Sequence, residues 1–249
     1  MNGSRPRRAT ASIAVLSAAC LVALVSACND ATLPWQLDHD RIVAVRASPP
    51  HIAAAERSSL DLLITSETDG PSVIAPLTAA VVPLETTTDG EPVATLPVST
   101  VPEAGGWTVI APDQATIDEF RAAMGWPPDM PVPVRIAVTV EIAGAPLSAI
   151  KTVYIGSDRD NPILGEVTID GQSARDGLTV ATAADIALRI DIDDTHEVDW
   201  LTSFGDLSDT SDEVATLRSD EPAAGHVAVV MRDQAGGVVW GLWNIEATD

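Results

Sequence analysis

The chain has 249 residues, of which 14 are Lys or Arg and 36 are Asp or Glu, so its formal net charge at pH 7 is −22. This charge argues against nucleic acid as a partner, because binding to phosphates needs a basic surface. It also argues against attachment to anionic lipid by charge, and it is compatible with divalent cations as ligands. The length is sufficient for one large or two ordinary domains.

The first 27 residues have the order of a secretory signal peptide. Arg5, Arg7 and Arg8 precede an apolar stretch over 11–27 that ends in small residues. A stable transmembrane helix needs about 20 apolar residues, and this alanine-rich run is shorter and is interrupted by serines. We therefore expect residues 1–27 to be a leader that is removed.

The leader ends in Val25-Ser26-Ala27-Cys28, which resembles the lipobox of bacterial lipoproteins: an aliphatic residue and two small residues before an invariant cysteine. The resemblance implies cleavage before Cys28 and a diacylglycerol on its thiol, because a thiolate is a good nucleophile towards a lipid donor. An uncleaved anchor or a plain signal peptide is the alternative. Cys20 lacks the aliphatic residue at the first lipobox position and reads as apolar filler.

Residues 28–40 are polar and irregular, and they predict a tether between the membrane and the fold. Asn29 is not the aspartate that favours retention in the inner membrane of many Gram-negative bacteria, so the lipobox resemblance implies the outer membrane. The sequence leaves open which face of that membrane the protein occupies. Since Cys20 and Cys28 are the only cysteines, we expect no disulfide in the folded part.

A first domain is predicted over 41–157, mostly from strands. Its opening run of β-branched residues stops at Pro49 and Pro50, and the passage 69–106 reads as short strands and loops. One helix is expected after Pro112, with Asp113 as its N-cap and Gly125 at its end. The stripe of that helix predicted to contact the core consists of Ile117, Phe120 and Met124.

After this helix, the sequence returns to β spacing. Apolar residues alternate with polar ones from Val134 to Ile142, which predicts a strand of a sheet with one buried and one wet face. The following stretch can return beside it as a hairpin across Gly144. A polar linker is predicted at 158–162, followed by a second domain over 163–249 with short strands separated by Gly and Asp turns.

Two phrases of the second domain resemble bacterial immunoglobulin-like domains. They are EVDWLTSFGDLS, with Trp200 on a central strand, and GHVAVVMRDQAGGVVW, whose strand ends in Arg-Asp-x-x-Gly-Gly. With the lipobox, the chain is similar to a group of predicted bacterial surface lipoproteins with tandem immunoglobulin-like domains. The resemblance implies a mostly β fold of two such sandwiches, the first with one inserted short helix. Without a cysteine pair, Trp200 is expected to pack against aliphatic side chains.

No catalytic constellation is recognisable, so we expect no enzyme. The four histidines are scattered, and neither a zinc-protease helix, a nucleophile elbow nor a phosphate loop is present. The acidic phrase from Asp191 to His196 lacks the spacing of an EF-hand loop and reads as a solvated strand end.

Two weaker site predictions concern the linker and one tryptophan. Asp158, Asp160 and Asn161 faintly resemble the Asp/Asn linkers by which cadherin repeats hold calcium, and the alternative is a polar linker that caps strand ends. Trp107 follows two glycines and could stack on a sugar, although a buried anchor is the simpler interpretation. Apart from the lipid on Cys28 and this calcium, no cofactor is expected.

The sequence therefore predicts a lipid-anchored protein of the cell envelope, a non-enzymatic binding or structural module. Its expected partners are the membrane, through the lipid, and an envelope protein or glycan. The alternative is an envelope carbohydrate-binding module or hydrolase with a site near Trp107.

Overall fold

The computed structural model describes residues 33–83 and 96–249. The leader and Cys28 lie outside these residues. The chain divides into two compact units, Met1–Pro34 and Trp35–Asp249, and every feature below belongs to the second unit. Within the described ranges, no helix is both long enough and apolar enough to cross a membrane.

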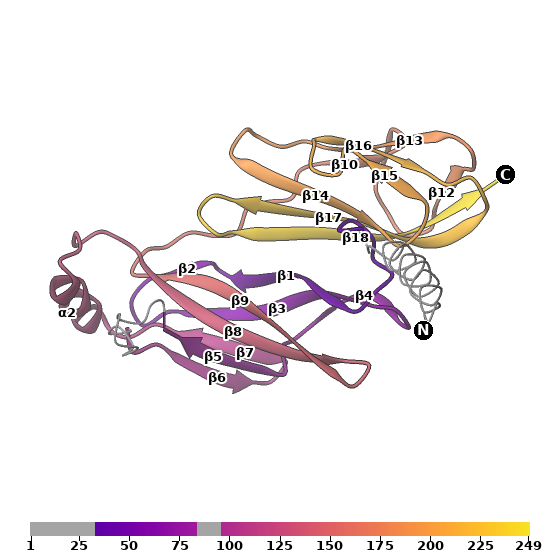
Figure 1. The fold of residues 1–249 in the computed structure, drawn as a ribbon. Helices are drawn as coiled ribbons and strands as arrows, with labels where there is room; N and C mark the ends of the chain where they lie inside the picture. The colour runs from indigo at the N-terminus through magenta and orange to yellow at the C-terminus, as the bar shows by residue number, and fades with distance from the viewer. Residues whose placement is uncertain (1–32, 84–95) are drawn as a thin grey trace, which may run out of the picture. The chain divides into compact units, whose positions relative to one another are not determined.

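The N-terminal strands form a first β-sandwich (Figure 1). Its strands are β1 (Arg41–Ser48), β2 (His51–Ile52), β3 (Arg57–Ser66), β4 (Gly70–Ile74), β5 (Thr78–Val82), β6 (Ser99–Glu103), β7 (Gly106–Ile110), β8 (Val132–Ile142) and β9 (Ala145–Ile155). One sheet has the order β1-β3-β7-β6 with β4 paired to β3, and the other has the order β2-β9-β8-β5.

The C-terminal strands form a second β-sandwich (Figure 1). Its strands are β10 (Val167–Ile169), β11 (Gln172–Ser173), β12 (Leu178–Ala181), β13 (Asp185–Ile190), β14 (His196–Thr202), β15 (Asp206–Ser208), β16 (Val214–Arg218), β17 (Ala223–Asp233) and β18 (Val238–Thr248). Its sheets have the orders β11-β10-β13-β16-β15 and β12-β18-β17-β14.

The two sandwiches repeat one strand topology. In each, the opening strand pairs with the next long strand of the first sheet, and a short following strand joins the last strand of the second sheet in parallel: β2 on β9, and β12 on β18. In the letters used for immunoglobulin domains, one sheet of each sandwich contains strands A, B, E and D (β1, β3, β7 and β6; β10, β13, β16 and β15). The other sheet contains strands G, F and C (β9, β8 and β5; β18, β17 and β14), which is the immunoglobulin arrangement. The predicted fold class, two immunoglobulin-like sandwiches, is confirmed.

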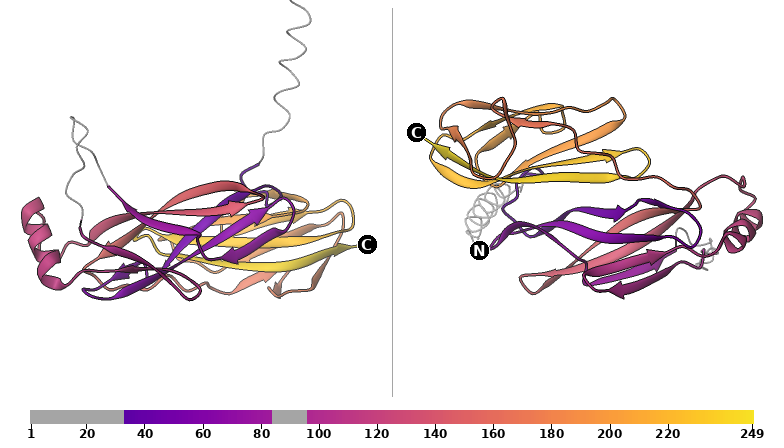
Figure 2. Two further views of the ribbon diagram at one scale, coloured as in Figure 1. Left: turned by 90° about the horizontal axis from the view of Figure 1, so that it is seen from below. Right: turned by 180° about the vertical axis from the view of Figure 1, so that it is seen from behind.

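The predicted helix is confirmed as α2 (Gln114–Met124), which lies beyond the strand ends of the first sandwich (Figure 2). Asp113 caps it by accepting from the backbone N–H of Thr116 at 2.9 Å, and Gly125 ends it in the left-handed conformation at φ 68°. Of the expected stripe, Ile117 is fully buried, and Phe120 packs partly buried against the core of the first sandwich.

The sequence did not foresee Arg121, which points inward from α2 and is 3% exposed. Its guanidinium donates to the carbonyls of Met130 at 2.8 Å and Gly156 at 3.1 Å. A side chain at Gly156 would lie 2.5 Å from this guanidinium. Arg121 therefore ties the helix to the end of β9, and a glycine is needed there.

Each sandwich has its own apolar core. The buried residues of the first core come from the segment 47–155, and those of the second core come from the segment 167–247. β8 alternates buried and more exposed residues along its length and forms the expected hairpin with β9. Trp200 on β14 is fully buried among aliphatic side chains, and its indole N–H donates to the carbonyl of Asp212 at 3.0 Å. The predicted core role of Trp200 is confirmed.

A third apolar cluster, here named the shared core, joins the two sandwiches. Two strands that are buried on both faces contribute residues to it, at 62–66 of β3 and at 227–231 of β17. Continuous buried runs of this kind mark strands covered on both sides. The buried members of the shared core are Leu37, Ala44, Leu63, Leu201, Ala228, Val230 and Val238, against which Val43, Trp240 and Leu242 pack.

The segment 35–37 differs from the expected polar tether over 28–40. Gln36 forms a parallel bridge with Thr202 of β14, and Leu37, 1% exposed, belongs to the shared core. The hydroxyl of Thr65 donates to the carbonyl of Leu37 at 2.5 Å. The physical reason is that a single leucine in a polar stretch gives no periodic signal, yet it fills a gap between two sheets.

Candidate functional site

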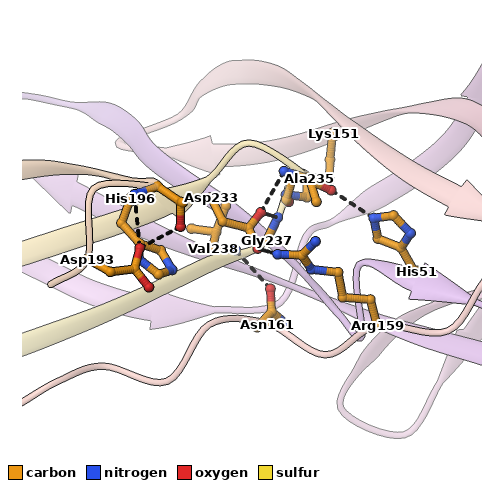
Figure 3. Close-up of polar contacts among 12 residues, drawn as sticks. His51, Lys151, Arg159, Asn161, Asp193, His196, Asp233, Ala235, Gly237 and Val238 are labelled. Carbon is orange, nitrogen blue, oxygen red and sulfur yellow. Dashed lines mark hydrogen bonds and ion pairs between the residues drawn. The ribbon is translucent and has the colours of Figure 1, made fainter.

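The turn over 233–237, between β17 and β18, is the centre of a polar junction between the sandwiches (Figure 3). Asp233 builds this turn: its Oδ1 accepts from the backbone N–H groups of Ala235 at 3.0 Å and Gly237 at 2.6 Å. Gly236 has φ +85°, a conformation that favours glycine. The Arg-Asp-x-x-Gly-Gly phrase is therefore a turn whose carbonyls are held in fixed directions.

His51 of β2 binds the turn from the first sandwich. Its Nε2 lies 2.9 Å from the carbonyl oxygen of Ala235, and its Nδ1 lies 2.8 Å from the hydroxyl of Ser157. Because a carbonyl only accepts, Nε2 carries a hydrogen, and a neutral ring then accepts from Ser157 at Nδ1. The ring also stacks on Tyr154 with 4.6 Å between centroids, and the residue is 8% exposed.

Lys151 of β9 binds the same turn. Its Nζ donates to the carbonyl oxygen of Gly236 at 2.5 Å, and the residue is 7% exposed. Burial lowers the pKa of the Lys151 amine to about 8, an effect that Asp233 partly opposes and Arg232 reinforces. A buried ammonium that is met by a neutral carbonyl is an energetic cost, and such groups are often functional.

The linker over 158–162 is held to both sandwiches by Asn161. Its Nδ2 donates to the carbonyl of Ala47 at 2.8 Å and to the hydroxyl of Ser48 at 3.3 Å, while its Oδ1 accepts from the backbone N–H of Val238 at 2.8 Å. Arg159 donates to Oδ2 of Asp233 at 3.1 Å. Arg159 and Asn161 thus connect the linker to both sandwiches.

The three residues of the predicted calcium site do not share one role. Asp158 and Asp160 are exposed, whereas the amide of Asn161 is committed to the two sandwiches. Among residues 33–83 and 96–249, no three His, Cys, Asp or Glu side chains are grouped so that they could hold a metal ion. The calcium site stays a prediction, and the structure gives Asn161 a different task.

Charged side chains extend the junction along the shared core. Arg46 of β1 forms a two-pronged pair with Asp61, at 3.1 and 2.6 Å, and stacks over the ring of Trp240 at 4.2 Å. Arg232 of β17 pairs with Asp199 and donates to the carbonyl of Val43 at 3.5 Å. Cation–π contacts at partly exposed sites contribute about 0.5–2 kcal/mol. These two arginines therefore help to fix the orientation of the strands that meet at the shared core.

Trp107 lies on β7, away from this junction in the sequence and in its contacts. Its ring packs, partly buried, against the core of the first sandwich, and its indole N–H donates to the carbonyl of Leu77 at 3.1 Å. This placement agrees with the interpretation of Trp107 as an anchor. A sugar platform there stays a prediction.

The acidic phrase before β14 is capped by its own residues. Asp193 accepts from the backbone N–H of Thr195 at 2.9 Å and pairs with His196 at 2.7 Å. Hydrogen bonds from Thr195 lower the pKa of the exposed Asp193 carboxyl. These contacts agree with a self-contained strand end.

The junction contains a Ser–His pair whose further contact differs from that of a hydrolase triad. Ser157 and His51 have the spacing of a nucleophile and its base, but the third partner of the ring is a carbonyl where a triad places a carboxylate. The ring is also nearly covered, which leaves little room for a substrate. The arrangement fits a structural lock.

The sequence alone did not predict His51, Lys151 and Arg159 as members of this junction. A signal existed for one of them. In the apolar alternation of β9, Lys151 occupies the same register as the buried Val153 and Ile155, where an apolar residue is expected. A charge at an inward position is a signal for a partner from elsewhere in the fold.

No protein-family model matches the chain, and a comparison with curated proteins gives no match. Among solved structures, the Ig1-2 module of Drosophila receptor protein tyrosine phosphatase DLAR is 13% identical over 85% of this chain and all 100% of its own, with a TM-score of 0.31. A chimeric titin Z1Z2 tandem is 12% identical over 84% of this chain and 100% of its own, with a TM-score of 0.29.

A nucleoside hydrolase-related protein from Saccharophagus degradans, described as associated with carbohydrate metabolism, is 12% identical over 36% of this chain. This chain spans only 26% of that protein's length, and the TM-score is 0.26. At such scores, these likenesses assign neither ligand nor activity to the present chain.

Proposed function

We propose that this chain is a lipid-anchored protein of the bacterial cell envelope whose paired sandwiches act as one non-enzymatic binding or structural module. The observation that carries the proposal is the shared core. Contacts between domains of one chain usually permit relative motion, unless they are large and apolar. Here an apolar cluster, capped by the junction of His51, Lys151 and Asn161, supports a rigid pair.

A rigid pair suits display at a membrane. Cys28 would carry the lipid, as its lipobox-like neighbours imply, and the outer membrane is the proposed location. Acyl chains are the appropriate anchor because a chain of net charge −22 gains nothing from anionic headgroups. The sandwiches would then hold one surface at a fixed orientation, available to an envelope protein or glycan.

The two cysteines provide a matched test of the anchor. Cells expressing wild type, Cys20→Ala or Cys28→Ala are labelled with a fatty-acid analogue and separated into membrane and soluble fractions. We expect wild type and Cys20→Ala to carry label and to sediment with membranes, whereas Cys28→Ala loses the label and becomes soluble or remains unprocessed. An unlabelled wild type would refute the anchor.

The carbohydrate-binding or hydrolase alternative near Trp107 has less support, because the indole N–H is already used within the fold. Retention on a defined envelope polysaccharide that is abolished by Trp107→Phe would revive it. This substitution keeps an aromatic ring in the core while it removes the indole.

A further inference from the structure

The last strand of the first sandwich has an open edge. β2 pairs with β9 only at Tyr154 and Ile155. On that side, the backbone N–H groups of Tyr154 and Gly156 donate to Pro50 at 2.9 Å and Ile52 at 2.8 Å. Because backbone groups alternate in direction along a strand, and because the β8–β9 register is unbroken, Ile150 and Thr152 also present their N–H and C=O groups away from β8.

This edge borders a groove of about 460 Å³. It is lined by residues 42–45 of β1, by residues 149–152 of β9, and by residues of the turn over 233–237. The turn is stiff, since Asp233 binds two of its N–H groups. Ile150 is 62% exposed at the groove. The volume is within the range of ligand sites, and the outward backbone groups of Ile150 and Thr152 have no strand partner within 33–83 and 96–249.

The charge balance of the groove is opposite to that of the chain. Asp233 is saturated by Arg159 and by the turn, and Arg232 pairs with Asp199. Lys151 is left with the neutral carbonyl of Gly236, and the ion pairs found among the described residues include none to its ammonium. In a chain of net charge −22, this groove therefore carries a positive charge that has no ion pair among the described residues and that the Asp233 carboxylate offsets only in part. The net charge of −22 opposes the association of two copies of the chain, and the positive charge of the groove favours an acidic ligand.

We propose that this groove binds an extended, acidic peptide segment of a partner protein, which adds to the edge of β9 and places a carboxylate beside Lys151. Main-chain hydrogen bonds to Ile150 and Thr152 give affinity in such strand addition, and the charged contact gives specificity. Burial holds the pKa of Lys151 near 8, so that its charge is present at neutral pH and is stabilised by an incoming carboxylate.

The test uses the full chain in detergent micelles and two fluorescent probes. One probe is a short acetylated and amidated peptide of alternating threonine and valine with a central aspartate, and the other has asparagine at that position. Binding is followed by fluorescence anisotropy. We expect the aspartate peptide to bind at least about tenfold more tightly than the asparagine peptide, and Lys151→Met to abolish this preference.

Two variants at one position isolate the edge. Ile150→Pro removes the outward N–H without breaking the ladder to β8, as edge prolines allow, whereas Ile150→Thr shortens the side chain and keeps the N–H. We expect binding to fall at least about tenfold in Ile150→Pro and clearly less in Ile150→Thr. Equal binding by both variants would overturn strand addition.

Binding of neither peptide by wild type would also overturn the proposal. If Lys151→Met then associated with itself, Lys151 would instead be a guard against edge pairing. The proposal deepens the binding role proposed above and rests on it. The two fail separately, because the anchor is measured by fractionation and the rigidity by distances between the sandwiches.

Discussion

The two sandwiches share a topology but close their open sides differently. In the second, β12 runs beside β18 over four residue pairs, from Leu178 opposite Ile245 to Ala181 opposite Thr248. In the first, the equivalent pairing of β2 with β9 covers only His51 and Ile52. The turn over 233–237 of the second sandwich binds beside this short pairing. An incomplete strand in one domain has thus become the place where the other domain attaches.

The apolar cores of the two sandwiches also differ. The second sandwich is organised around one large side chain, Trp200, at the position of strand C where immunoglobulin domains place a buried tryptophan. The first sandwich has no aromatic side chain on the equivalent β5, and it adds α2 and the buried Arg121 between its strands E and F. We therefore expect a single substitution to damage the second sandwich more than any comparable one damages the first.

The largest effect is expected from Trp200→Ala, which empties a fully buried site. Truncation of a buried tryptophan costs about 3–5 kcal/mol of unfolding free energy. Hydrogen exchange should show loss of protection in β14 and β17 while β8 and β9 keep theirs, since the cores of the sandwiches are separate. Unchanged thermal unfolding would show that the ring is not a core element.

Leu62 and Leu63 allow the first core and the shared core to be tested independently. They are neighbours on β3 and both 0% exposed, but Leu62 belongs to the first core and Leu63 to the shared core. Each Leu→Ala change should cost about 2–5 kcal/mol. Only Leu63→Ala should also broaden the distribution of distances between labels on the two sandwiches. Equal broadening by Leu62→Ala would contradict the assignment of separate cores.

Lys151→Met should have a pH-dependent effect. The amine titrates near 8 in the folded protein and near its usual 10.5 when unfolded, so between these values the unfolded chain binds more protons. Wild-type stability therefore rises with pH across this window, and below it the full cost of burial is present. Relative to Lys151→Met, the unfolding free energy of wild type should rise by about 3 kcal/mol from pH ~7 to pH ~11. The unfolding free energies are measured by denaturant titration at each pH. If they changed with pH by the same amount in wild type and in Lys151→Met, this would contradict the burial of a charged amine.

The smallest effect is expected at the linker. Asn161→Ala removes hydrogen bonds to Ala47, Ser48 and Val238, which should cost about 1–2 kcal/mol in total because Asn161 is only half-buried. The exposed Asp160 provides the control, and Asp160→Ala should change stability by less than about 0.5 kcal/mol. A larger loss in Asp160→Ala than in Asn161→Ala, present only with calcium, would favour the metal-bound linker.

Local patterns predicted much of this fold. Asp113 and Gly125 marked the ends of α2, alternation marked β8, and the position of Trp200 marked a core. Such features depend on residues close in the sequence. The linker at 158–162 rests on local residues of the same kind and stays a prediction.

The junction could not be predicted in the same way, because its partners are distant in the sequence. His51 meets Ala235, and Lys151 meets Gly236, through backbone carbonyls that any residue could supply. The shared core left one sign in the sequence, the short apolar run 62–64 of β3 and the longer run 227–231 of β17, because consecutive apolar residues on a strand require a cover on each face. The sequence also does not show whether an asparagine side chain binds protein groups or a metal ion. The contacts of Asn161 with both sandwiches therefore could not be distinguished from a calcium ligand in advance.

The most direct test of the rigid pair is a distance distribution between the sandwiches. The fragment Trp35–Asp249 forms one compact unit and contains no cysteine, so Glu141→Cys and Ala187→Cys, both exposed, introduce one spin label in each sandwich. Pulsed electron–electron double resonance then measures the distance between the two labels, once with calcium and once with a chelator. A rigid pair predicts one narrow distance that is the same in both conditions. A broad distribution, or one that narrows only with calcium, would contradict it.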